Sequence, residues 1–210
     1  MSDNILVVCS LVIVVITVGF ILCYVFLFFI YFCILNRYMA VDFRSLRYPG
    51  MVSYKALLGD GCTGYAVAMF HAALTTKNYV CPLEAETLLP MMYINDCIRG
   101  TVEFVSADVS RVPARVYNMT AMSFYPRILH AIIREYCLDF NVTYAPDNRQ
   151  IIAASWPDSL DDSQATKDWA WKPQYDLRRT TIRMLNKLHK RYALNTVIRG
   201  VTDVDVDAML

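Results

Sequence analysis

The sequence predicts an α/β fold preceded by one N-terminal transmembrane helix. The run from Ile5 to Leu35 contains no charged residue over 31 consecutive positions, whereas about 20 suffice to cross the hydrocarbon core of a bilayer. Strand-like and helix-like segments then alternate through the rest of the chain, mostly with short links, which is typical of α/β folds. The predicted parts are a short N-terminal tail at 1–4, a transmembrane helix at 5–36, the α/β domain at 37–196 and a flexible acidic tail at 197–210.

Charge and metal-binding residue types exclude several functions. The formal net charge of +1 argues against a nucleic-acid-binding protein, which usually carries a basic patch. The seven cysteines include no C-x-x-C pair, and three of them lie in the apolar run, so free thiols are expected. The three histidines fall in separate helical patterns without ligand spacing, so no metal site is predicted.

The flanks of the apolar run favour a membrane span over a cleaved signal peptide. The four residues before it carry an acidic rather than a basic residue, and the run is longer than the apolar core of a signal peptide. Arg37, Arg44 and Arg47 follow the run and no basic residue precedes it, which predicts a cytoplasmic C-terminal part. The alternative is a segment that is unrelated to the domain and is joined to a fragment of it.

Short strands are expected throughout the domain. The first is Phe43–Tyr48, which Pro49 and Gly50 should end. Residues 145–161 should form a loop. Further extended segments are expected at 79–81, 88–93, 115–118 and 141–144.

Helices are expected between these strands, at 65–75, 95–105, 123–136, 162–169 and 177–192. Candidate N-caps are Thr63 for the first helix, Asn95 or Asp96 for the second and Ser123 for the third. The apolar stripe predicted for the second helix consists of Cys97, Ile98, Val102 and Val105.

Several motifs in the same order resemble one family over residues 37–194. The quoted stretches are Leu89-Pro-Met-Met-Tyr-Ile-Asn-Asp-Cys97, Tyr117-Asn-Met-Thr-Ala-Met-Ser-Phe124 and Asp161-Asp-Ser-Gln-Ala-Thr-Lys-Asp-Trp-Ala-Trp-Lys172. Together with 43–53 and 155–157, they resemble the short-chain type of L-threonine 3-dehydrogenase, an extended short-chain dehydrogenase/reductase (SDR) related to the epimerases. The resemblance implies the C-terminal part of a Rossmann fold with its smaller substrate lobe. It also implies NAD-dependent oxidation of L-threonine to 2-amino-3-oxobutanoate, in mitochondria when the enzyme is animal.

The resemblance assigns cofactor-binding residues. Met51 would contact NAD near the nicotinamide, through its backbone, and Tyr48, Pro49 and Gly50 would shape the same wall.

The resemblance also assigns substrate-binding residues. Residues 59–65 resemble the glycine-rich substrate loop, in which Thr63 matches a threonine whereas Cys62 and Gly64 depart from the pattern. Trp156 would face the site, with plain packing as the alternative. Asp96 matches an acidic position of the family, with a helix N-cap as the alternative.

Two parts of the family's machinery have no counterpart in the 210 residues. No G-x-x-G-x-x-G loop is present, and none of the fourteen tyrosines has a lysine four residues later. We therefore expect a truncated, threonine dehydrogenase-like chain that is inactive alone. The alternatives are a membrane-tethered, non-catalytic fragment that binds a full-length homologue, or a gene-model product.

The missing half also bears on partners and stability. The family dimerises chiefly through helices of its first half, which leaves homodimer formation by this chain open. The strand at 43–48 would belong inside a parallel sheet whose earlier strands are missing. We therefore expect a lower stability than that of a complete domain.

Overall fold

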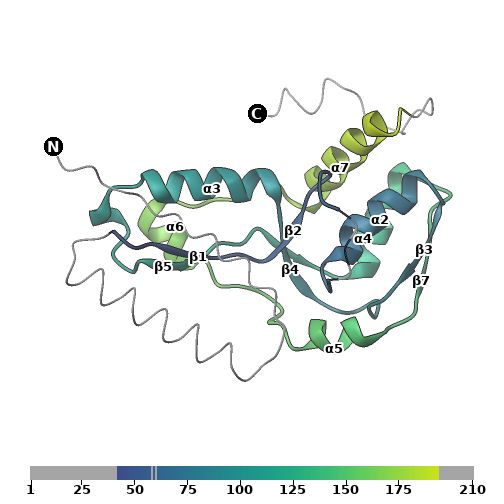
Figure 1. Cartoon of the computed structure of the whole chain (residues 1–210), viewed down its shortest axis with the longest axis horizontal. Coiled ribbons are helices and arrows are strands. Elements are labelled where there is room, and N and C mark those ends of the chain that lie inside the picture. Colours follow the sequence, from purple (N-terminus) through teal and green to yellow (C-terminus); the bar gives the residue numbers. More distant parts are fainter. Residues whose placement is uncertain (1–41, 58, 60, 194–210) are drawn as a thin grey trace.

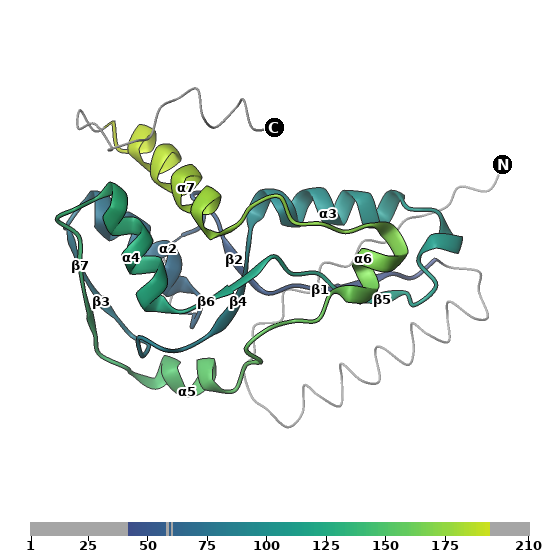
Figure 2. The same ribbon diagram turned by 180° about the vertical axis from the view of Figure 1, so that it is seen from behind.

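The computed structural model describes residues 42–57, 59 and 61–193, in an elongated α/β arrangement (Figure 1). One end, here called the α3 lobe, consists of β1 (Ser45–Arg47), β5 (Val116–Asn118), α3 (Ile94–Ser106) and α6 (Ser163–Trp169). The other end, the α2 lobe, consists of α2 (Gly64–Leu74), β3 (Asn78–Cys81), α4 (Pro126–Tyr136), β7 (Asn141–Tyr144) and α7 (Leu177–Arg191). The remaining elements are β2 (Gly50–Val52), β4 (Leu89–Tyr93), β6 (Met122–Phe124), α5 (Asn148–Ala154) and the 3-10 helix η1 (Val109–Arg111). The view from behind shows the same separation of the two lobes, with β4 and β6 between them (Figure 2).

Strand β4 connects the two lobes because it contributes to both hydrophobic cores. Every residue of β4 is buried. Successive side chains of a strand point to opposite sides. Accordingly, Leu89, Met91 and Tyr93 pack in the core of the α2 lobe, whereas Met92 packs in the core of the α3 lobe.

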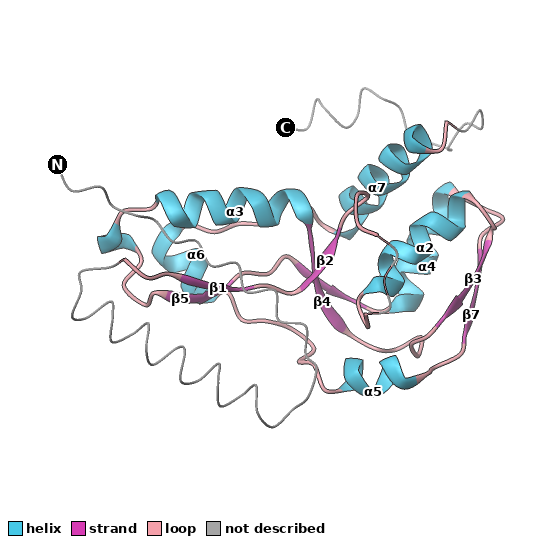
Figure 3. Cartoon of the chain, viewed as in Figure 1, coloured by secondary structure: helices cyan, strands magenta, loops and turns pink. Residues whose placement is uncertain are grey.

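Three small sheets form among the described residues (Figure 3). In the central sheet β4 lies between β2, which is parallel to it, and β6, which is antiparallel. Strand β1 pairs in parallel with β5, and β3 pairs in parallel with β7. The predicted α/β class is thus confirmed in the part of the chain that the structure describes.

The strand predicted at 43–48 is shorter than expected, and a second strand follows it closely. Residues Ser45–Arg47 form β1, and Gly50 begins β2 instead of ending a strand. Pro49 has no N–H to donate to a sheet ladder. The chain therefore leaves β5 at this point and pairs with β4 from Gly50 onward.

Helix α3 differs from its prediction in both its start and its buried face. It begins at Ile94 after Tyr93, so neither Asn95 nor Asp96 is the N-cap. Its buried residues are Asp96, Gly100 and Phe104. The predicted stripe is wrong, because Ile98 and Val102 are 58% and 60% exposed.

Two observed elements, β6 and α5, were not predicted, and one predicted cap is wrong. Strand β6 contains Ser123, which therefore does not cap α4; that helix begins at Pro126 after Tyr125. Helix α5 lies inside the predicted loop, where the Asp147 side chain accepts a hydrogen bond from the Arg149 N–H. By contrast, Thr63 is the residue before α2 as predicted, although its side chain forms no capping hydrogen bond.

The buried carboxylate of Asp96 fixes the segment that follows α6 to the start of α3. It is fully buried and accepts hydrogen bonds from the backbone N–H groups of Gln174 (2.9 and 3.1 Å) and Tyr175 (2.9 Å). The Arg99 guanidinium donates to it at 2.9 Å and also to the Lys172 carbonyl at 2.7 Å. A buried charge is tolerated only when it is paired and hydrogen-bonded, and here both conditions hold.

None of the helices in the described ranges has the length and apolar character of a membrane span. The predicted transmembrane helix at 5–36 and the predicted tail at 197–210 lie outside those ranges.

The role of Asp96 can be tested with Asp96→Asn. The amide keeps the shape of the carboxylate but loses its charge, so hydrogen bonds to a charged acceptor are lost. We expect the free energy of unfolding to fall by about 3 kcal/mol. The measurement is denaturant unfolding followed by circular dichroism.

The matched control for this substitution is Asp158→Asn, at an exposed position. It should change the free energy of unfolding by less than about 0.5 kcal/mol. Equal effects of the two substitutions would contradict the anchoring role of Asp96.

Candidate functional site

The four residues predicted to form the cofactor wall lie where the chain passes from β1 to β2. Pro49 and Gly50 are buried, whereas Tyr48 and Met51 are partly buried and pack against the core of the α3 lobe. Met51 is paired with Met92 in the parallel register of β2 and β4. The position of Met51 is therefore set by the strand that both cores share.

Tyr48 is held by a hydrogen bond to α3. The Thr101 hydroxyl donates to the Cys97 carbonyl at 2.6 Å, so the Tyr48 hydroxyl is the donor in its 2.7 Å contact with Thr101 Oγ1. Burial raises the pKa of the Tyr48 hydroxyl above its ordinary value, and the hydrogen bond with Thr101 offsets only part of this effect. Tyr48 therefore stays protonated at neutral pH and is unsuited to act as a general base.

The structure brings Thr63 next to the predicted cofactor wall. A Cβ on Gly50 would lie 2.6 Å from Thr63 Cγ2 and 2.5 Å from Met91 Sδ. Only a glycine at position 50 allows these two side chains to approach the backbone of β2 so closely. Gly50 was predicted to belong to the cofactor wall and Thr63 to bind the substrate, and the two residues lie in contact.

The glycine-rich loop before α2 is folded tightly on itself. The Gly64 N–H donates to the Gly61 carbonyl at 3.0 Å, and a Cβ on Gly64 would lie 2.6 Å from the Gly59 carbonyl oxygen. Cys62 is buried in the same loop, and this burial raises the pKa of its thiol. The thiol is therefore mainly protonated and a poor nucleophile near neutral pH.

Trp156 lies after α5 and is partly buried against the core of the α2 lobe. Its backbone N–H donates to the Ala153 carbonyl at 3.1 Å, which closes the end of α5. These contacts are those of a packing residue. The role of Trp156 in substrate binding stays a prediction.

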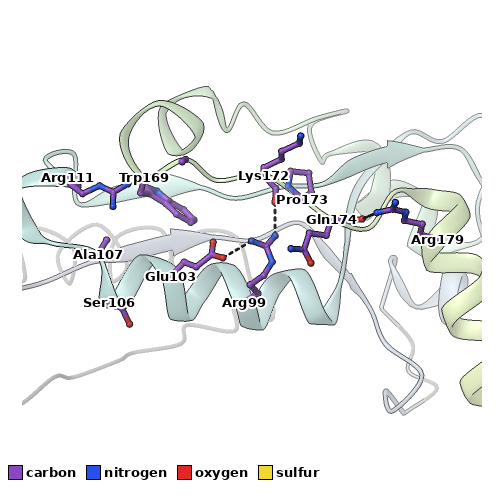
Figure 4. Close-up of a pocket in the computed structure, with 11 residues that line it drawn as sticks. Arg99, Glu103, Ser106, Ala107, Arg111, Trp169, Lys172, Pro173, Gln174 and Arg179 are labelled. Atoms are coloured by element: carbon purple, nitrogen blue, oxygen red, sulfur yellow. Dashed lines mark hydrogen bonds and ion pairs between the residues drawn. The ribbon is translucent and has the colours of Figure 1, made fainter. Parts of the chain in front are cut away.

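A cavity of about 670 Å³ lies in the α3 lobe (Figure 4). Its walls come from α3, η1 and the segment from Trp169 to Arg179. No site was predicted there, although Trp169, Ala170 and Lys172 belong to the family-like stretch at 161–172. The other lining residues include Arg99, Glu103 and Arg111, which are distant from this stretch in the sequence. The cavity shares no lining residue with the wall formed by 48–51.

The contact between Gly50 and Thr63 can be tested by a double-mutant cycle. Gly50→Ala places a methyl group against Thr63 and Met91, and we expect it to lower the free energy of unfolding by about 1–3 kcal/mol. Thr63→Ser removes the Cγ2 methyl group that the new Cβ would meet. In the Thr63→Ser background, the Gly50→Ala loss should therefore be smaller by at least about 0.5 kcal/mol.

The control for the cycle is Gly61→Ala, because a Cβ at that position meets no atom within 4 Å. This substitution should leave stability nearly unchanged in either background. Strict additivity of Gly50→Ala and Thr63→Ser would show that the two residues are not in contact.

Comparison with known proteins agrees with the resemblance seen in the motifs. No protein-family model matches the chain. The mitochondrial L-threonine 3-dehydrogenase of Bos taurus is 46% identical over 147 residues, which are 70% of this chain and 39% of that protein. An uncharacterised epimerase/dehydratase of Staphylococcus aureus is 38% identical over 72% of this chain and 48% of its own length.

A solved structure extends the likeness to the fold. The GalE-like L-threonine dehydrogenase of Cupriavidus necator, in its holo form, matches with a TM-score of 0.71 and 47% identity. The match covers 73% of this chain and 50% of that one. The chain thus spans half or less of the length of these relatives. Over the matching part it is homologous to the L-threonine 3-dehydrogenases and epimerase/dehydratases, and it has the α/β fold of the extended SDRs.

Proposed function

We propose that this chain provides the substrate-side half of an L-threonine 3-dehydrogenase-type fold. The reaction of this family is the NAD-dependent oxidation of L-threonine to 2-amino-3-oxobutanoate. The contact of Gly50 with Thr63 is the observation that supports the proposal most directly, because it joins the predicted nicotinamide wall to the predicted substrate loop. The 46% identity with the bovine relative supports the same assignment.

In this proposal NAD would lie with its nicotinamide against Met51, while Tyr48, Pro49 and Gly50 support that wall. The protonated Tyr48 hydroxyl is directed to Thr101, so it positions the wall and takes no proton from the substrate. The Thr63 side chain forms no capping hydrogen bond to α2. In this proposal its hydroxyl would hydrogen-bond L-threonine instead. Trp156 is kept as a further substrate contact.

We further propose that the chain alone does not oxidise threonine. In the family a tyrosine acts as general base beside a lysine, and a glycine-rich loop brings the backbone to the pyrophosphate. Neither pattern occurs in the 210 residues. The chain would therefore contact one side of the cofactor and leave the rest unbound.

We propose the mitochondrion as its location, because the bovine relative is a mitochondrial L-threonine 3-dehydrogenase. Attachment to a membrane through 5–36 stays a prediction.

Catalytic incompetence has a direct assay. The purified full-length chain, supplied with NAD and L-threonine, should form no NADH above background, because no base accepts the hydroxyl proton. The bovine relative serves as the positive control in the same buffer. Threonine-dependent NADH formation by the chain would refute the proposed inactivity.

Substrate recognition is tested separately by saturation-transfer NMR with L-threonine. We expect weak binding that Thr63→Val reduces by about ten-fold, because the isosteric valine lacks the hydroxyl group. Thr166→Val, at an exposed position on α6, is the control and should bind as the unmodified chain does. Undiminished binding by Thr63→Val would contradict the role of Thr63.

A further inference from the structure

Helix α3 carries apolar side chains on the face opposite to the one that it buries. Ile98 and Val102 each follow a buried residue by two positions, which is about 200° around the helix, so they point away from the core of the lobe. They are 58% and 60% exposed, and Val105, about one turn further along the same face, is partly buried. These three residues are here called the α3 stripe.

The α3 stripe is unusual for a helix at the surface of a domain. Such a helix normally has one apolar face, which packs on the core, and polar residues on the opposite face. Exposed apolar residues that are contiguous, unlike single ones, mark a surface that another segment or molecule covers. The exposure of Ile98 and Val102 shows that no segment in the described ranges covers them.

The described part of the chain begins beside the end of α3. The Arg44 guanidinium donates to the carbonyls of Phe104 and Val105, in the last turn of α3, and also pairs with Asp42. Both views show that β1 starts at the end of the lobe where α3 ends (Figures 1 and 2). Asp42 is therefore held close to the last turn of α3.

The sequence before Asp42 fits the α3 stripe in composition and in reach. Residues 25–35 consist only of Val, Leu, Ile, Phe, Tyr and Cys. Six residues separate them from Asp42, and six extended residues span at most about 20 Å, which is also about the length of the 13-residue helix α3. A tether this short gives residues 25–35 a local concentration in about the millimolar range at the stripe.

We propose that residues 25–35 of this chain pack on the α3 stripe and cover it. A second copy of the chain at micromolar concentration competes poorly with a tethered segment. Residues 194–210 fit less well, because they follow α7 in the other lobe and contain Arg199 and three aspartates. The uncharged run from Ile5 to Leu35 is about ten residues longer than a membrane span needs, so residues 25–35 are available even when the earlier residues cross a bilayer.

The test is cross-linking within the purified full-length chain in a neutral detergent. Cys33 supplies one thiol, and Val102→Cys supplies the other in the middle of the stripe. Cys9, Cys23 and Cys97 are replaced by alanine, and the remaining three cysteines are buried. With a short bis-maleimide, we expect an intramolecular link between Cys33 and position 102, identified by mass spectrometry of the digested monomer.

The matched control is Ile151→Cys in the same background, at an exposed apolar position on α5. The link to position 102 should form in a yield at least about ten-fold higher than the link to position 151, because only the stripe holds residues 25–35 nearby. Equal yields at the two positions would contradict the proposal.

A second variant tests whether the contact is apolar. Ile98→Asp places a carboxylate on the stripe, and burying it under residues 25–35 is unfavourable. We therefore expect the yield of the link to position 102 to fall at least about five-fold. The control Ile152→Asp, at an exposed position on α5, should leave the yield unchanged. Circular dichroism shows whether each variant is folded, and an undiminished link in folded Ile98→Asp would contradict the proposal.

Other occupants of the α3 stripe would give different products. A link between two chains, seen as a cross-linked dimer, would show that a second copy covers the stripe. Loss of the intramolecular link when the chain is placed in phosphatidylcholine vesicles would show that the bilayer takes up residues 25–35. Either result would overturn the proposal.

Discussion

The structure depends on one strand that serves two hydrophobic cores. Because β4 is buried on both sides, neither lobe can shift its packing without moving the other. The same strand fixes β2 through the pairing of Met51 with Met92 and approaches Gly50 through Met91. The candidate site is therefore built against a strand that both cores hold in place, which is a favourable position for residues predicted to contact a cofactor.

Local sequence patterns were sufficient where an element is self-contained. Strand β7 was predicted at its observed bounds, and α7 ends within one residue of the predicted helix. They were insufficient where a neighbour decides the outcome. The stripe that contains Ile98 and Val102 was predicted to be a core face, but Met119 and Trp171 pack closely against α3 at Gly100 instead. A glycine adds little to an apolar pattern, and only the three-dimensional contact shows that this face is the buried one.

The candidate cofactor and substrate site and the cavity beside α3 also differ in how far the sequence predicted them. The wall at Tyr48–Met51 and the loop at Thr63 were predicted because a family motif covers each of them, and the structure adds that Gly50 and Thr63 are in contact. The cavity beside α3 was missed because the family-like stretch at 161–172, which contributes Trp169 and Lys172, suggested no site there, and because Arg99 lies 73 residues from Lys172 in the sequence. Asp96 was predicted either to match an acidic position of the family or to cap its own helix, and the prediction of a cap is wrong. The backbone N–H groups that donate to its carboxylate lie 78 and 79 residues away in the sequence, so no local pattern could reveal them.

The way in which Asp96 binds its partners sets what evolution can change there. It recognises the backbone N–H groups of Gln174 and Tyr175 and not their side chains. Most amino acids offer the same N–H, so the identities of these two residues are free to drift as far as Asp96 is concerned. Proline is the exception, because it has no N–H to donate. The contact therefore constrains the residue type at position 96 but hardly constrains the types at positions 174 and 175. Sequence conservation that reflects this contact is expected only at position 96.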